Sequence, residues 1–136
     1  MIWLLDTNTL IYFTNRDRGF ERIARRMSGR SPGEIRMSSI TLSELEYGVE
    51  NSRHQEENRA ALDDLVALVQ VDDYPHRAGR HFAEIKSALR AKGRQTKPYD
   101  LFIGAHARAL DATLVTNDAD DFRHMPGLRL VNWLRP

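Results

Sequence analysis

The sequence contains no cysteine, so the fold has no disulfide framework and is compatible with the reducing cytoplasm. It also contains no apolar run close to the roughly 20 residues that a helix needs to span a bilayer. The first residues carry neither a basic leader nor an apolar stretch followed by a cleavage site. We therefore expect a soluble, cytoplasmic protein with no membrane partner.

No composition shift, repeat or linker divides the chain. Its 136 residues suit one domain, 1–136, which is large enough to bury a core of two or three layers without a structural metal.

The chain lacks a large net charge, but its charges are unevenly placed. The formal charge is +1, yet residues 16–36 hold seven arginines against three acids. Residues 80–97 hold six basic side chains and one acid; the basic ones are Arg80, Lys86, Arg90, Lys92, Arg94 and Lys97. Such segments are either solvated helix faces or contacts for a polyanionic substrate.

Apolar periodicity predicts alternating strands and helices. Short apolar runs predict strands at 1–5, 35–40, 69–73, 112–116 and 128–133. Helical spacing predicts helices at 7–15, 20–27, 41–51 and 54–69, with later helices that Pro75 and Pro98 open. This alternation favours an α/β fold with a mostly parallel central sheet.

Acidic residues follow several of these strands. Asp6 ends the first strand, Glu44 comes shortly after the second, and Asp118 follows the strand at 112–116. Sites in parallel α/β sheets form beyond the carboxyl ends of the strands, so these carboxylates are expected to converge. Asp100, in the helix after Pro98, is expected to join them.

Each acid also has a structural explanation. Asp6 and Asp118 can cap the turns that follow them, and Asp100 suits the first turn of a helix. Glu44 stands three residues after Thr41, as in a capping box. Independent caps have no reason to gather at one edge of a sheet, which favours a common site.

Crowded carboxylates repel one another, and a divalent cation removes that conflict. Oxygen ligands suit Mg²⁺ or Mn²⁺, whereas zinc would need His or Cys at ligand spacing. The five histidines show no such pair, which indicates surface or packing roles. A metal held by carboxylates supports phosphodiester hydrolysis by an activated water, with Thr7, Asn8 and Asn117 as orienting or turn-forming neighbours.

Four segments carry a resemblance to a known family: "LDTNTLIYF", "ITLSELEYGVENS", "KPYDLFIGAHARAL" and "LVTNDADDF", followed by "PGLRLVNW". In this order and spacing they resemble the PIN-domain ribonucleases, and closely the VapC toxins of toxin–antitoxin pairs. The resemblance implies a three-layer α/β/α PIN-like domain and an endoribonuclease that depends on Mg²⁺ or Mn²⁺.

The resemblance also assigns the site residue by residue. It implies that Asp6, Glu44 and Asp100 are catalytic metal ligands. Relatives often have Asn where this chain has Asp118 and Glu where it has Asp121; we favour Asp118 as the fourth acid, with Asp121 as the alternative. Gly104, at a position that is commonly Ala, bears on packing.

The resemblance further implies the biology. Such toxins cut RNA to inhibit translation, and some cleave initiator tRNA in the anticodon stem-loop. The basic side chains of 16–36 and 80–97 are then candidates for RNA backbone contacts, or for contacts with an acidic stretch of the antitoxin. A VapB-type antitoxin neutralises them in a hetero-oligomer, and the toxin is expected to be a homodimer. Two alternatives are a non-catalytic RNA- or partner-binding module of the same fold and a phosphatase of the haloacid-dehalogenase type. The phosphatase would need a second Asp where this chain has Asn8.

Overall fold

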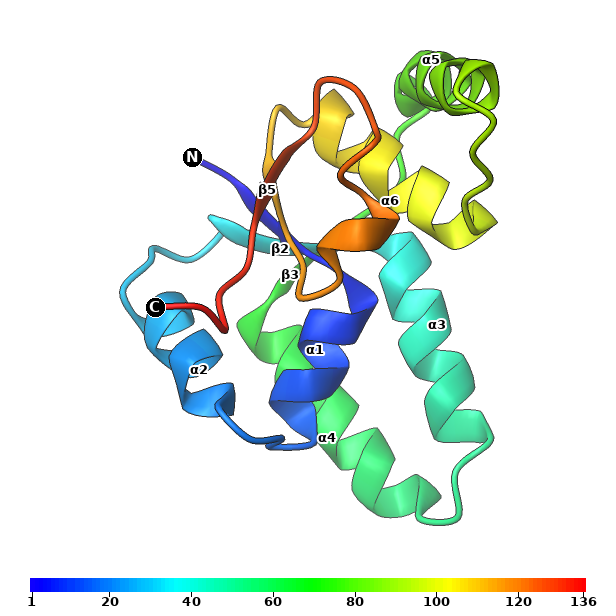
Figure 1. Cartoon of the computed structure of the whole chain (residues 1–136). Coiled ribbons are helices and arrows are strands. Elements are labelled where there is room, and N and C mark those ends of the chain that lie inside the picture. The colour runs from blue at the N-terminus through cyan, green and yellow to red at the C-terminus, as the bar shows by residue number, and fades with distance from the viewer.

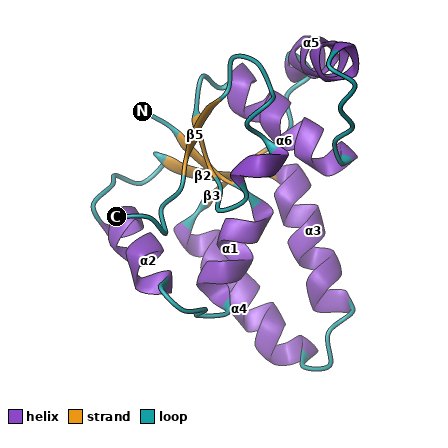
Figure 2. Cartoon of the chain, in the orientation of Figure 1, coloured by secondary structure: helices purple, strands orange, loops and turns teal.

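The computed structural model describes the whole chain, residues 1–136, and is organised around one five-stranded sheet (Figure 2). The strands are β1 (Trp3–Leu5), β2 (Ile35–Ser38), β3 (Gln70–Asp72), β4 (Thr113–Val115) and β5 (Arg129–Val131). They lie in the order β3-β2-β1-β4-β5, and every neighbouring pair is parallel. The prediction of a parallel α/β sheet is confirmed.

Helices cover both faces of this sheet. They are α1 (Thr7–Thr14), α2 (Phe20–Ser28), α3 (Ser39–Glu50), α4 (Gln55–Leu68), α5 (Ala78–Ala91) and α6 (Pro98–Ala109), with a short 3₁₀ turn, η1 (Ala119–Asp121). Leu4 and Leu114 belong to the core under α5 and α6, whereas Leu5 and Val115 belong to the core under the other helices (Figure 1). Because helices pack on both faces of the sheet, the three-layer α/β/α arrangement is confirmed. None of the helices is both long and apolar enough to cross a membrane.

The strand order creates a crevice at one edge of the sheet. The chain builds outwards from β1 through β2 to β3, and then returns to place β4 on the other side of β1. The chain leaves β1 towards β2 and leaves β4 towards β5, which lie in opposite directions along the sheet. The space beyond the carboxyl ends of β1 and β4 therefore stays open. The segments after β1 and β4, which contain Asp6 and Asp118, meet there (Figure 1).

Several predicted boundaries are wrong. Strand β2 ends at Ser38 instead of residue 40, because the Ser38 hydroxyl accepts a hydrogen bond from the Ile40 amide (3.1 Å) and starts α3 early. Thr41 therefore lies inside the helix, and the predicted capping box with Glu44 is not formed. Helix α5 begins at Ala78, after a turn in which the Ala78 amide donates to the Pro75 carbonyl (3.0 Å).

Gly104 permits a close approach between α6 and the segment after η1. A Cβ atom at this position would lie 2.5 Å from Sδ of the buried Met125. Alanine favours helix by about 1 kcal/mol over glycine, but overpacking a core costs about 1–3 kcal/mol. The glycine therefore fits the bulk of Met125 in this chain.

We expect Gly104→Ala to destabilise the protein by about 1 kcal/mol, because the contact with Met125 outweighs the gain in helix propensity. The measurement is the urea midpoint of unfolding. Gly48→Ala in α3 is the matched control, since a Cβ there meets nothing within 4 Å and should stabilise the fold. Equal stabilisation by both substitutions would contradict the packing argument.

Candidate active site

An acidic pocket of about 100 Å³ lies beyond the carboxyl ends of β1 and β2, against the start of α6. It is lined by Asp6, Thr7, Asn8, Glu44, Lys97, Tyr99, Asp100, Ile103 and Asp121. These residues come from four separate parts of the sequence. The structure therefore brings together three of the four predicted catalytic acids and the alternative fourth acid, Asp121.

Asp6 is the most buried of these acids, with 3% of its surface exposed. Its Oδ1 accepts a hydrogen bond from the Thr9 amide (2.8 Å). Asp6 therefore caps α1, which was the structural explanation offered for it by the sequence. Burial raises its pKa, while hydrogen bonds from Thr116 and Thr9 lower it and the charge of Asp118 raises it further. The cap fixes the carboxylate where it also lines the pocket.

Glu44 is held by a hydroxyl instead of by the backbone. Oγ1 of Thr7 lies 2.6 Å from Glu44 Oε1 and 3.2 Å from Thr41 Oγ1. The single proton of Thr7 is donated to the carboxylate, so the Thr41 hydroxyl is the donor to Thr7. Thr7 thus has the orienting position expected of it, and Thr41 supports it from inside α3.

Asp100 occupies the first turn of α6, where the helix dipole favours a negative charge. Even so, its pKa is raised to about 6, first by burial and then by the negative charge of Asp121. Lys97 opposes this rise, and Asp6 and Glu44 add to it. A carboxyl that is half-protonated at about pH 6 shows that burial and neighbouring acids together disfavour its charged form.

Asp118 and Asp121 act as a pair. A hydrogen bond with the Asp121 side chain raises the pKa of Asp118, followed by burial and the charge of Asp121, while Lys97 lowers it. The Asp118 amide donates a hydrogen bond to the Thr116 hydroxyl oxygen (2.9 Å), and the Asp118 side chain makes no capping bond to η1. Asp118 and Asp121 are the two candidates for the fourth acid, and their side chains contact each other. Asp121 is the one that lines the pocket.

The other predicted residues are spread more widely. Asn8 is exposed and lines the acidic pocket, whereas Asn117 lines a separate cleft next to it. All six basic side chains proposed for RNA are exposed, and Lys97 is the one that lines the acidic pocket. Lys92 and Arg94 lie near His124, whose pKa is lowered by burial and then by these cations. Arg80, Lys86 and Arg90 lie along α5.

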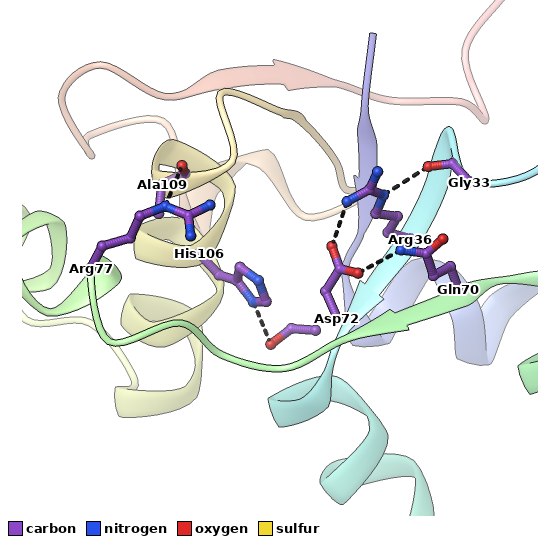
Figure 3. A network of polar contacts seen from close by, with 8 residues as sticks. Gly33, Arg36, Gln70, Asp72, Arg77, His106 and Ala109 are labelled. Atoms are coloured by element: carbon purple, nitrogen blue, oxygen red, sulfur yellow. Dashed lines mark hydrogen bonds and ion pairs between the residues drawn. The ribbon is translucent and has the colours of Figure 1, made fainter.

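A buried hydrogen bond that was not predicted from the sequence joins the two helices that carry Glu44 and Asp100. His106 of α6 is fully buried, and its Nδ1 lies 2.8 Å from Oγ of Ser38 at the start of α3 (Figure 3). Burial lowers the pKa of His106, so its ring is neutral near pH 7. Beside it, Arg36 donates to Asp72 (2.9 Å) and joins β2 to β3 (Figure 3). The contact ties α3, which carries Glu44, to α6, which carries Asp100.

Replacing Ser38 by alanine should destabilise the protein by about 2 kcal/mol. The change removes the cap of α3, worth about 1 kcal/mol, and leaves the buried His106 nitrogen without a partner. Ser43→Ala is the control, because the exposed Ser43 hydroxyl only donates to the Ser39 carbonyl within the same helix (3.1 Å). Urea unfolding of both variants measures the difference, and equal midpoints would contradict this role of Ser38.

The acidic pocket offers carboxylate oxygens to a divalent cation. No three acidic or histidine side chains surround one point closely enough to form a complete metal centre. Mg²⁺, however, keeps several of its waters and needs only one or two direct carboxylates. Burial first raises the pKa values of Asp6 and Asp100, and a hydrogen bond with Asp121 first raises that of Asp118. Neighbouring carboxylates add to all three, and a cation would relieve that repulsion. The oxygen-only donor set therefore fits Mg²⁺ or Mn²⁺ and does not fit zinc.

Comparison with known proteins agrees with this fold. The PIN domain family profile matches residues 3–128. The ribonuclease VapC2 of Rickettsia felis is 35% identical over 98% of both chains, and the tRNA(fMet)-specific endonuclease VapC of Salmonella typhimurium is 37% identical over 96% of this chain and 97% of its own.

Solved structures give the same result. The Rickettsia felis VapBC2 complex, bound to a DNA fragment from its promoter, superposes with a TM-score of 0.89 at 34% identity, over 98% of this chain and 99% of that chain. VapBC-1 from nontypeable Haemophilus influenzae superposes with a TM-score of 0.90 at 31% identity, over 99% of this chain and all of that chain. The chain therefore belongs to the PIN-domain family and, within it, to the VapC ribonuclease group.

Proposed function

We propose that this protein is a metal-dependent endoribonuclease that acts as the toxin of a VapBC-type pair. The observation that carries the proposal is the pocket of four carboxylate-bearing segments at the point where the strand order reverses. Relatives of nearly the same length that are named ribonucleases support the reaction. The reaction is hydrolysis of an RNA phosphodiester bond.

The residues divide the work within this pocket. A bound Mg²⁺ or Mn²⁺ would lower the pKa of an attacking water and stabilise charge on the phosphate in the transition state. Asp6 and Asp100 hold the cation, and Glu44 is kept in position by the Thr7 hydroxyl. Asp118 and Asp121, whose side chains contact each other, would complete the ligand set. Lys97 reduces the repulsion among these acids.

We propose transfer RNA as the substrate, and the anticodon stem-loop of initiator tRNA as the cleavage site. Support comes from the Salmonella typhimurium relative, which is named for tRNA(fMet). Exposed cations next to the pocket suit a folded polyanion, and their contacts make binding depend on salt. Cleavage of this RNA would stop translation, which places the protein in the cytoplasm.

A VapB-type antitoxin is the proposed partner, together with a second copy of the toxin. Several of the similar solved structures are VapBC complexes. A groove of about 280 Å³ between α1, α3 and α4 offers Ile11, Leu45 and Leu62 to an occupant. Glu44 lines both this groove and the acidic pocket, so an occupant of the groove would reach the site.

The test is incubation of antitoxin-free protein with total bacterial RNA in Mg²⁺, in Mn²⁺ and in EDTA, followed by sequencing of the new RNA ends. We expect discrete cuts that need the cation and that map to the anticodon loop of one tRNA. Cuts in another RNA would retain the nuclease and overturn the tRNA assignment. Intact RNA in every reaction, from folded and metal-loaded protein, would favour a binding module without catalysis.

A further inference from the structure

A second cleft, of about 560 Å³, adjoins the acidic pocket on the other side of Asp118. It is lined by Arg26, Thr116, Asn117, Asp118, Ala119, Asp120, Leu130, Val131, Asn132, Arg135 and Pro136. These residues come from α2, from the loop after β4 and from the C-terminal segment after β5. Asp118 lines this larger cleft, which contains two arginines, and contacts Asp121, which lines the acidic pocket.

The two arginines of this cleft have no anionic partner. Neither guanidinium makes a hydrogen bond or ion pair with the protein, although other arginines of the chain are paired, as Arg108 is with Glu84 (2.7 Å). The acids of the cleft are engaged elsewhere, since Asp120 pairs with Arg123 (3.1 Å) and Asp118 with Asp121. The cleft thus has positive charge available for an anion from outside.

Local hydrogen bonds hold this end of the chain in place. Arg22 of α2 donates to the Leu134 carbonyl (2.7 Å), which fixes the C-terminal segment beside α2 (Figure 1). The Asn132 carbonyl oxygen of the side chain accepts from the Leu134 amide (2.8 Å), so its NH₂ group is left as a donor. The result is a built cleft with two cations and two amide side chains, Asn117 and Asn132.

We propose that this cleft holds the RNA strand on one side of the scissile bond, with Arg26 and Arg135 on a backbone phosphate and Asn117 and Asn132 facing the adjoining nucleotide. This inference rests on the proposed nuclease function. Lys97 lines the acidic pocket from the loop between α5 and α6, and this loop and the C-terminus lie on opposite sides of the segment after β4 (Figure 1). The strand would therefore pass from Lys97, over the carboxylates, into the cleft. Phosphate contacts of this kind fix the position of the strand at the site.

The first test measures binding without cleavage. The probe is a labelled single-stranded RNA of mixed sequence, about 20 nucleotides long, bound to protein that carries Asp6→Asn. Arg26→Gln and Arg135→Gln should each weaken binding about tenfold, and each should reduce the slope of log affinity against log salt by about 0.7. Arg25→Gln is the matched control, because Arg25 is an exposed neighbour in α2 that does not line the cleft.

The second test uses cleavage and separates the two proposals. With active protein and a mapped cleavage site, each arginine substitution should raise KM with little change in kcat. When the substrate is shortened from one end until no nucleotide reaches the cleft, wild type and variants should have the same KM. Shortening the substrate from the other end should preserve the difference in KM.

Two outcomes would overturn the inference, and they differ. If wild type cleaves RNA while Arg26→Gln and Arg135→Gln behave like Arg25→Gln, the cleft does not hold the strand and the nuclease proposal stands. If wild type neither cleaves nor binds RNA, both proposals fail together.

Discussion

Asp6→Asn should reduce RNA cleavage by at least about a thousandfold while leaving RNA binding almost unchanged. The amide cannot supply the negative charge that the proposed cation needs, and loss of about 4 kcal/mol of transition-state stabilisation corresponds to that factor. The Asn side chain still has an oxygen to accept the hydrogen bond from the Thr9 amide, so the cap of α1 survives. The measurement is single-turnover cleavage of a tRNA beside binding of the same RNA.

The same substitution should stabilise the metal-free protein. Burial raises the pKa of Asp6 above its unfolded value, so its charged form is penalised in the folded state. The penalty is absent at pH values below the unfolded pKa and complete once the pH exceeds the folded pKa. Near pH 7, replacement by a neutral amide should raise the free energy of unfolding by about 1 kcal/mol, or Tm by about 3 °C.

Asp64→Asn is the matched control for both effects, because Asp64 is an exposed acid on α4 far from the pocket in the fold. It should change neither cleavage nor Tm. A variant at Asp6 that cleaves as fast as wild type would remove this carboxylate from the site. A variant that loses both cleavage and stability would indicate a structural role instead of a chemical one.

The parts of this site that could be predicted from sequence are those fixed by strand ends. Apolar runs located β1 and β4, and a parallel sheet brings their carboxyl ends to one edge, so the proximity of Asp6 to the segment that holds Asp118 followed from local patterns. Asp100 was placed by Pro98, which opens α6 in the structure as predicted. Its contact with Asp121 depends on how α6 packs.

The parts that could not be predicted depend on contacts between distant side chains. The pattern at Thr41 and Glu44 matches a capping box, but Ser38 caps the helix and Thr7 binds the glutamate. Local spacing cannot decide between such partners, since Thr7 is 37 residues from Glu44 in sequence. The cleft around Arg135 could not be predicted for the same reason, because its residues come from distant parts of the sequence. The one signal for the Ser38 contact was a histidine within an otherwise apolar stretch of α6.

The pocket should also make metal binding and stability depend on pH together. The pKa of Asp100 is about 6 in the folded protein, and the ordinary value for the unfolded chain is 3.8. Between these values the folded state holds the extra proton, so the stability of the metal-free protein falls as pH rises through this window. We expect Tm without metal to be higher at about pH 5 than at about pH 7.5. Asp100→Asn should remove part of the difference, because the raised pKa values of Asp6 and Asp118 act in the same direction.

A divalent cation should reverse this trend, because it competes with the proton for the same carboxylates. At about pH 7.5, Mg²⁺ or Mn²⁺ at 100 times its Kd stabilises the folded state by about 2.7 kcal/mol, which is about 8–10 °C in Tm for a domain of this size. At about pH 5 the same concentration should give a much smaller shift, since Asp100 is then mostly protonated. Asp64→Asn should keep the full pH dependence. A thermal shift of equal size at both pH values would place the cation away from these carboxylates, and the metal role proposed for them would be wrong.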